Sequence, residues 1–544
     1  MTRAKTPWVR ACMLHHNLDD GDWFVCVIFE KVDGSEGRML LPRSQMDDPR
    51  GAKRTLVAQG AKIPTDTDWL ENLRHALSAE NCPIVESTAV CGWHKGAYIL
   101  KDRIVGKKGH LHPLVPELRS TLRNGTTKAW RLGFEEPCAE SSYLTFVIAA
   151  ALAGPLLRPM GYDEGVVFHL FGESSTGKSL AAIAAQSVVE RAGRDSLRTF
   201  DLTARALEEE AAACNDSLLV LDEAGRIEGT TAQRRQHFSD LAFKVAGGQG
   251  RQRSAKATAD TALRNVRYLV IGLSSGEEPL EARGAAQRKG GEQVRLIGVP
   301  VPHPDDGGIF DLQQSAAKRA QLAAMAEQTI ANNYGVLLPA FVKAFISDNE
   351  GPRRAKEYSE KFVNRQLSQS ATFARRFARK FAAPYAAAML AADYGLAPWT
   401  KKQAGNAIRK VYREAWKEVR PAECRADEFL AILQRKANKN RFFPLVEAGE
   451  KLDPAALEKA WGVRRSHEGR TQLAMFRRRF AELVPMQDLD VLRVLAARGL
   501  VLPGKEQRLY VRQIRIRGLA KPRTDVIMFD LDKIIGAVEE AAAA

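Results

Sequence analysis

The architecture of this 544-residue chain follows from one stretch, Gly172-Glu173-Ser174-Ser175-Thr176-Gly177-Lys178-Ser179. The stretch matches the phosphate-binding pattern Gly-x-x-x-x-Gly-Lys-Ser. An apolar run, Val166–Phe171, precedes it, and small helix-forming residues, Leu180–Ala185, follow it. A strand, a loop and a helix in this order point backbone N–H groups and a helix N-terminus at phosphates. The sequence therefore predicts that residues 172–179 bind ATP.

The residues that would carry ATP hydrolysis follow from this loop. Lys178 is expected to reach the β- and γ-phosphates, and the Ser179 hydroxyl to ligate Mg²⁺. A second apolar run, Leu218–Leu221, ends in Asp222 and Glu223. We expect Asp222 to hold the Mg²⁺ through its water shell and Glu223 to polarise the attacking water. Because the second carboxylate serves water, the pair favours hydrolysis over kinase-like transfer.

A third apolar run, Tyr268–Gly272, leads into Ser274 and Ser275. A hydroxyl at the end of such a strand is expected near the γ-phosphate, where it helps to place the water, although Ser-Ser-Gly is also an ordinary turn. The sequence does not separate the two serines. A fourth run, Val294–Val299, completes an alternation of strands and helices that predicts a mostly parallel sheet covered by helices.

Ring-shaped ATPases complete each site with an arginine from the neighbouring subunit, which stabilises the charge of the transition state. Three arginines lie downstream of the third run: Arg283, Arg288 and Arg295. Arg295 heads the fourth run and is the first candidate. A surface or DNA-facing role stays open for each of the three.

The formal net charge of +16 indicates a polyanionic partner. Residues 351–420 hold 16 Lys and Arg against 5 Asp and Glu, an excess that favours nucleic acid over a solvated helical face. A basic, glycine-containing hairpin is predicted to grip a single strand, or else to be a flexible loop. Its cations are Lys244, Arg251, Arg253 and Lys256. A second contact surface is expected at Arg375, Arg376, Arg379 and Lys380, with Arg376 alternatively serving the nucleotide.

The cysteines and apolar segments bear on location. The seven cysteines are scattered without a Cys-x-x-Cys pair, as in reduced cytosolic proteins. Cys91 and His94 have half of a zinc-like spacing, but no second pair follows. No stretch reaches the roughly 18 apolar residues of a membrane span, and the N-terminal residues lack the apolar region of a signal peptide. We therefore expect a cytoplasmic protein without a membrane segment.

Five segments are predicted along the chain. They are a β-rich N-terminal domain (1–105), a helical connector (106–163), the ATPase core (164–305), a helical lid region (306–424) and a winged-helix-like DNA-binding domain (425–544). The first contains a predicted hairpin of residues 23–29 and 37–41. The fourth contains predicted helices over 316–331 and 371–392. The last assignment depends on short helices followed by a strand pair at 510–516 and 526–529.

These motifs, in this order, resemble the family catalogued as domain of unknown function 927. The resemblance covers roughly residues 20–420. It is carried by Gly92-Trp93-His94, residues 172–179, Thr203 with Leu207-Glu208, Leu221-Asp222-Glu223, residues 247–253, residues 273–277 and Val294-Arg295-Leu296. The family is similar to AAA+ ring helicases of the superfamily 3 and mini-chromosome-maintenance type, and its members are associated with plasmids, prophages and other mobile elements. The resemblance implies an α/β P-loop AAA+ core, a homo-hexamer, a C-terminal winged helix and Arg295 as the finger that acts in trans.

The expected function is that of an ATP-dependent DNA helicase or translocase that uses ATP and Mg²⁺. It would work as a hexameric ring with single-stranded DNA in its pore, in the replication of a mobile genetic element. One alternative is an AAA+ ATPase that remodels a protein partner. Its gripping loop would begin with an aromatic-hydrophobic pair, which residues 244–256 lack. Another alternative is a DNA-binding switch in which ATP only controls assembly.

Overall fold

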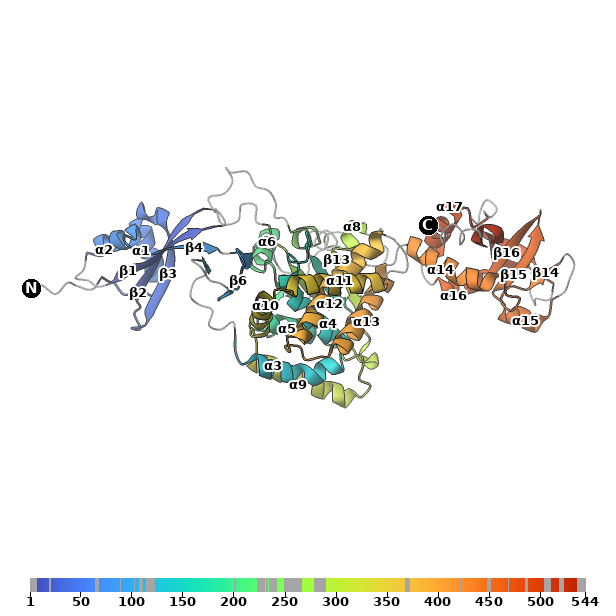
Figure 1. Cartoon of the computed structure of the whole chain (residues 1–544), viewed down its shortest axis with the longest axis horizontal. Helices are drawn as coiled ribbons and strands as arrows, with labels where there is room; N and C mark the ends of the chain where they lie inside the picture. Colours follow the sequence, from blue (N-terminus) through green and yellow to red (C-terminus); the bar gives the residue numbers. More distant parts are fainter. Residues whose placement is uncertain are drawn as a thin grey trace, which may run out of the picture. The chain divides into compact units, whose positions relative to one another are not determined.

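The structure is a computed structural model. The chain forms two compact units, Met1–Glu418 and Val419–Ala544 (Figure 1). Each unit is described by itself. The residues that the structure describes are 7–18, 21–63, 68–88, 90–101, 103–106, 111–113, 123–199, 202–222, 230, 233, 242–248, 267–277, 290–366, 372–419, 422–447, 452–467, 469–484, 488–502, 510–517 and 523–535.

The N-terminal region of the first unit is β-rich, as predicted. Its sheet has the order β3-β2-β1-β4-β8 and contains β1 (Val9–Asn17), β2 (Trp23–Glu30), β3 (Glu36–Pro42), β4 (Ile84–Thr88) and β8 (Leu111–Pro113). The strands β2 and β3 form the predicted hairpin. Two helices that the sequence analysis missed, α1 (Pro49–Ala58) and α2 (Trp69–Ser78), pack on this sheet (Figure 1). Each helix begins at an aspartate cap, Asp48 or Asp68, whose side chain accepts backbone N–H groups of the first turn.

The core of the first unit is the predicted parallel sheet. It contains β9 (Val166–Phe171), β10 (Arg198–Thr199), β11 (Leu218–Asp222), β12 (Ile271–Gly276) and β13 (Leu296–Pro300), in the order β10-β11-β12-β9-β13. All four strand pairs are parallel. The third strand begins later than expected, since Leu269 N donates to the Asn215 side chain instead of joining the ladder.

Helices cover both faces of this sheet. One face is packed against α4 (Ser142–Ala153), α5 (Lys178–Val189) and α12 (Thr372–Asp393). The rings of Phe146, Phe168 and Phe381, from α4, β9 and α12, lie 5.0–5.5 Å apart and join these layers. The other face is packed against α6 (Ala204–Ala213), whose Leu207 and Ala211 lie in one cluster with Val167 and Leu219.

The helical region after the sheet agrees with the prediction. Its helices are α9 (Ala316–Asn332), α10 (Leu337–Ser347), α11 (Gly351–Gln366), α12 and α13 (Lys401–Val419). A further helix, α3 (Thr127–Ala139), packs against α9. None of the helices in the described part of the chain is long and apolar enough to cross a membrane.

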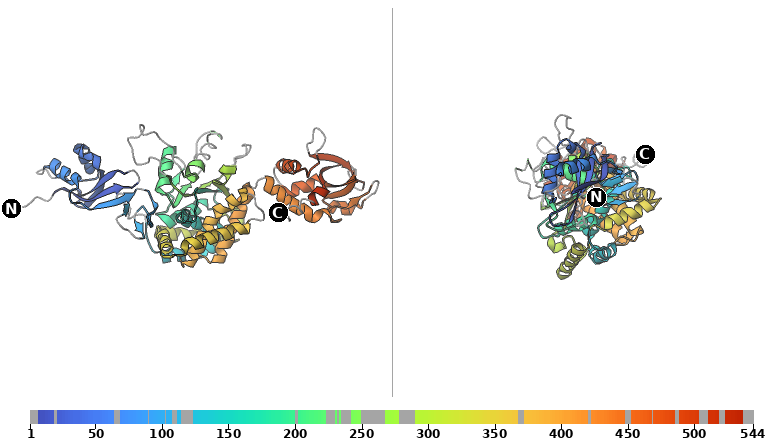
Figure 2. Two further views of the ribbon diagram at one scale, coloured as in Figure 1. Left: turned by 45° about the horizontal axis from the view of Figure 1, so that its top comes forward. Right: turned by 90° about the vertical axis from the view of Figure 1, so that its left-hand side faces the viewer.

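The second unit has more strand than the predicted two-stranded wing (Figure 2). Its sheet, in the order β14-β15-β16-β18-β17, contains β14 (Leu445–Val446), β15 (Gly462–His467), β16 (Arg470–Phe476), β17 (Val511–Arg515) and β18 (Arg523–Asp530). The predicted pair is confirmed as β17 and β18, but β16 joins it through β18. One face packs against α14 (Ala422–Ala437), α16 (Arg477–Leu483) and α17 (Asp488–Ala497), and the short α15 (Pro454–Lys459) packs on the other. The charged residues in β15 and β16 interrupt the apolar pattern from which strands are predicted, so the sequence did not indicate these two strands.

Candidate functional site

The loop of residues 172–179 joins β9 to α5 at the carboxyl edge of the parallel sheet. Its backbone takes left-handed conformations at Gly172, Ser175 and Gly177, with φ values of 150°, 63° and 91°. A Cβ at Gly177 would lie 2.7 Å from Cγ1 of Ile309, so the packing also requires glycine there. The backbone N–H of Ile309 donates to the carbonyl of Thr176 at 2.9 Å. The segment after β13 therefore packs against the loop and stabilises its backbone conformation.

Lys178 lies inside this loop. Its Nζ donates to the carbonyl oxygens of Gly172 (2.8 Å) and Glu173 (2.6 Å) and to Oγ1 of Thr176 (3.1 Å). Burial lowers the pKa of the Lys178 ammonium, while the carboxylates of Glu277 and Asp222 act in the opposite direction. The ammonium donates its hydrogen bonds to neutral oxygens, and an anionic phosphate is a stronger acceptor for it. The residues fit the phosphates of ATP.

Asp222 ends β11 at the same edge of the sheet and is buried. The hydroxyl of Ser275, on the neighbouring β12, donates to Oδ1 of Asp222. The hydroxyl of Ser274 instead lies 2.9 Å from Nδ1 of His169, which is fully buried in β9. Successive side chains of a strand point to opposite faces, so the tertiary structure separates the two serines. Asp222 and Ser179 offer the oxygen ligands that Mg²⁺ prefers.

The remaining predicted site residues either have a local structure that the sequence did not predict or lie outside the residues that the structure describes. Glu223, Arg251, Arg253, Lys256, Arg283 and Arg288 are outside the described residues. Lys244 lies in a π-helical turn, Ala242–Ala246, and the part of the predicted hairpin from 249 to 256 is outside the described residues. The carbonyl of Lys244 accepts a hydrogen bond from the Tyr268 hydroxyl at 2.6 Å. Val245 and Ala246, which directly follow Lys244, are buried and hold this turn against the sheet.

Arg295 directly precedes β13, as predicted. Its Nε donates to Oε2 of Glu164 at 3.0 Å, within the same chain. Two of the four basic residues expected on a nucleic-acid surface, Arg376 and Lys380 of α12, contact the same carboxylate. Lys380 is buried, which removes it from that predicted surface.

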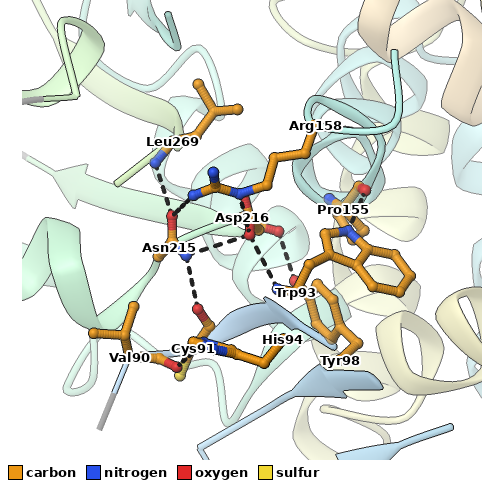
Figure 3. A network of polar contacts seen from close by, with 10 residues as sticks. All are labelled: Val90, Cys91, Trp93, His94, Tyr98, Pro155, Arg158, Asn215, Asp216 and Leu269. Carbon is orange, nitrogen blue, oxygen red and sulfur yellow. Dashed lines mark hydrogen bonds and ion pairs between the residues drawn. The ribbon is translucent and has the colours of Figure 1, made fainter. Parts of the chain in front are cut away.

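A polar network fixes the start of β11 (Figure 3). The side chain of Asp216 is fully buried and accepts hydrogen bonds from Arg158 Nε (2.7 and 2.8 Å) and from the backbone N–H of Trp93 (3.0 Å). The Asp216 carbonyl accepts from the Tyr98 hydroxyl at 2.6 Å. The Asn215 amide donates to the Cys91 carbonyl at 2.8 Å. Burial raises the pKa of the Asp216 carboxyl, while Arg158 opposes the shift.

This network explains the motif Gly92-Trp93-His94. These residues form β5 (Gly92–His94), which pairs with β6 (Ala97–Ile99), and β6 pairs with β7 (Ile104–Val105). A Cβ at Gly92 would lie 2.4 Å from the Asp216 carboxylate, so the approach requires glycine. The Trp93 indole donates to the Pro155 carbonyl at 2.7 Å. His94 is bonded to the Val90 carbonyl, so the zinc-like half-motif is structural here.

The sequence analysis missed Asp216, Asn215 and Arg158. A signal was present, because Asn-Asp-Ser before an apolar run is typical of a turn, and Asp216 does take a left-handed φ of 53°. Arg158 lies 58 residues away in sequence and carries no local signal.

Comparison with known proteins finds one similar family and a similar fold. Residues 10–266 match the family described as "Domain of unknown function (DUF927)", so the predicted resemblance to that family is confirmed over this segment. The solved structure described as "SCCmec type IV Cch - active helicase" is similar, with a TM-score of 0.59 and 17% identity. The similarity covers 97% of this chain and 94% of that chain, and it shows a shared mixed α/β fold. No similar sequence is found among curated proteins.

Proposed function

We propose that the chain is an ATP-hydrolysing DNA helicase or translocase of AAA+ type, which works as a homo-hexameric ring in the replication of a mobile genetic element. The carrying observation is that Lys178, Asp222 and Ser275 converge at one edge of the parallel sheet. The strand of Ser275 lies between the P-loop strand and the strand of Asp222, an order that supports an AAA+ core. The shared fold with a protein described as an active helicase supports the choice of helicase.

The residues have distinct roles in this proposal. The loop at 172–179 binds the phosphates, and Ser179 and Asp222 hold Mg²⁺, which neutralises phosphate charge when bound. Glu223 polarises the attacking water, and Ser275, in preference to Ser274, places it near the γ-phosphate. Arg295 stabilises the transition state from the neighbouring subunit.

Nucleic acid is the proposed partner. Lys244, Arg251, Arg253 and Lys256 contact a single strand, and the second unit binds DNA as a winged-helix-like domain. Residues 419–544 carry 24 Lys and Arg against 17 Asp and Glu, which supports that contact.

The test is steady-state ATP hydrolysis by the full chain, with and without single-stranded DNA. We expect stimulation by DNA, loss of nucleotide binding in Lys178→Ala, and loss of turnover with retained binding in Glu223→Gln. As a matched control, Asp195→Asn changes an exposed carboxylate paired with Arg191 and keeps full activity. Hydrolysis that ignores every nucleic acid would contradict the translocase and favour protein remodelling. DNA binding without hydrolysis would favour the ATP-controlled switch.

A further inference from the structure

One carboxylate, that of Glu164, is shared by three cations. Oε2 of Glu164 accepts from Arg295 Nε at 3.0 Å, while its Oε1 lies 2.9 Å from Lys380 Nζ and 3.5 Å from Arg376 Nη2. The three cations come from two elements far apart in sequence, the start of β13 and the helix α12. Lys380 is buried, Glu164 is mostly buried and Arg376 is half-exposed. We call these four residues the Glu164 cluster.

The cluster lies at the edge of the sheet opposite to the chain's own P-loop. The Val167 N–H donates to the Arg295 carbonyl at 2.8 Å, so Arg295 lies beside the start of β9. The P-loop begins five residues later, after the end of the same strand, which at about 3.3 Å per residue is roughly 17 Å away. An arginine in this position serves a nucleotide bound by another copy more readily than its own.

The cluster also has a charge surplus. With Lys380 protonated, three positive charges surround the Glu164 carboxylate, and Asp163 adds only one further negative charge near Lys380. A buried carboxylate that loses its single partner is left as an unpaired buried charge, which destabilises the fold strongly. Glu164 avoids this cost, because Lys380 and Arg376 stay paired with it when Arg295 turns away. The ion pair of Arg295 is therefore exchangeable, and an anionic phosphate is a suitable competing partner.

From this geometry we propose that Glu164 is a positioning residue for Arg295, which it holds at the subunit edge for transfer to the γ-phosphate of ATP bound by the neighbouring subunit. The role of Lys380 and Arg376 is to keep Glu164 paired during that transfer. Glu164 touches no substrate, so its effect acts through Arg295. The inference rests on the proposed function, in which Arg295 acts in trans.

The test uses mixtures of full-length variants, in which each variant can supply one half of a shared site. Lys178→Ala chains do not bind their own ATP but can donate Arg295, whereas Arg295→Ala chains bind ATP but donate no arginine. Each variant alone is expected to be nearly inactive, and their equimolar mixture to regain ATP hydrolysis. If the mixture regains none, the site shared between subunits fails, and the role of Glu164 fails with it.

Glu164→Gln is then placed on one side of the shared site at a time. In Lys178→Ala chains, which donate the arginine, it should lower the hydrolysis of the mixture about tenfold. In Arg295→Ala chains, which provide the pocket, the same substitution should leave the regained hydrolysis within about twofold. A structural role would lower both mixtures equally, and that result would overturn the proposal, as would no loss in either mixture. Asp195→Asn on the donor side, in the exposed pair with Arg191, is the matched control and should have little effect.

Discussion

The hydroxyl of Ser275 donates a hydrogen bond to Oδ1 of Asp222, across the neighbouring strands β12 and β11. Ser274, the adjacent residue, bonds to His169 inside the sheet instead. The two serines therefore have different partners, one at the nucleotide edge and one in the core.

Ser275→Ala should lower the kcat of ATP hydrolysis by about 10- to 100-fold, because Asp222 loses the donor that orients its carboxylate. The KM for ATP should change little, since the phosphate contacts of the P-loop remain. Steady-state kinetics at several Mg²⁺ concentrations measure both quantities. Ser274→Ala is the matched control, expected to keep kcat within about threefold while lowering thermal stability, because the buried His169 loses its hydrogen bond to the Ser274 hydroxyl. Equal kcat losses in the two variants would contradict this assignment.

Asp216→Ala should destabilise the first unit by about 2–3 kcal/mol, because the Trp93 N–H and Nε of the half-exposed Arg158 lose their acceptor. Denaturant unfolding of the full chain, followed by tryptophan fluorescence, measures the change. Asp195→Ala removes a carboxylate from an exposed pair with Arg191 and should cost less than about 0.5 kcal/mol. A comparable loss of unfolding free energy in the two variants would show that the Asp216 network stabilises the fold no more than an exposed ion pair does.

Lys380 should make stability depend on alkaline pH. Burial lowers the pKa of its ammonium to about 8, opposed by Glu164 and Asp163 and assisted by Arg376. An unfolded lysine titrates near pH 10.4, so between about pH 8 and 10 the unfolded chain holds a proton that the folded chain has lost. Stability then rises with pH across this interval, by about 3 kcal/mol in total, and the contribution is lost as pH falls through 8.

Unfolding of the full chain in denaturant at pH 7.5 and 9.5 measures this contribution. Lys380→Met should remove it, so that the difference in stability between the two pH values becomes less positive. Arg376→Gln should retain most of it, because a guanidinium does not titrate in this range. A pH dependence unchanged in Lys380→Met would exclude Lys380 as its source.

The double substitution Arg251→Ala with Arg253→Ala should weaken single-stranded DNA binding and reduce its dependence on salt. Each lost phosphate contact lowers the slope of log K against log salt by about 0.7 for single strands. Fluorescence anisotropy of a labelled oligonucleotide at several salt concentrations measures the slope. Arg191→Ala, in the exposed pair with Asp195, is the control and should leave it unchanged. An unaltered slope in the double variant would argue against a DNA contact there.

The sequence by itself determined the nucleotide-binding half of the site and most of the core. The pattern of Gly172–Ser179 fixes a backbone conformation locally. The apolar runs before Gly172, before Asp222 and after Arg295 mark buried parallel strands. Residues within such a run or turn are close in sequence, so their local conformation can be predicted from the spacing of the residue types. The helices α9 and α12 were predicted for the same reason.

Only the tertiary structure decided the pairings between distant segments. It separated Ser275 from Ser274, joined Glu164 to Arg295 across 131 residues, and joined Asp216 to Trp93 across 123. Lys380 looked like a surface cation in the sequence, yet packing of α12 on the sheet buries it. The physical reason is that hydrogen bonds and ion pairs between segments depend on strand register and helix packing, which no local pattern encodes.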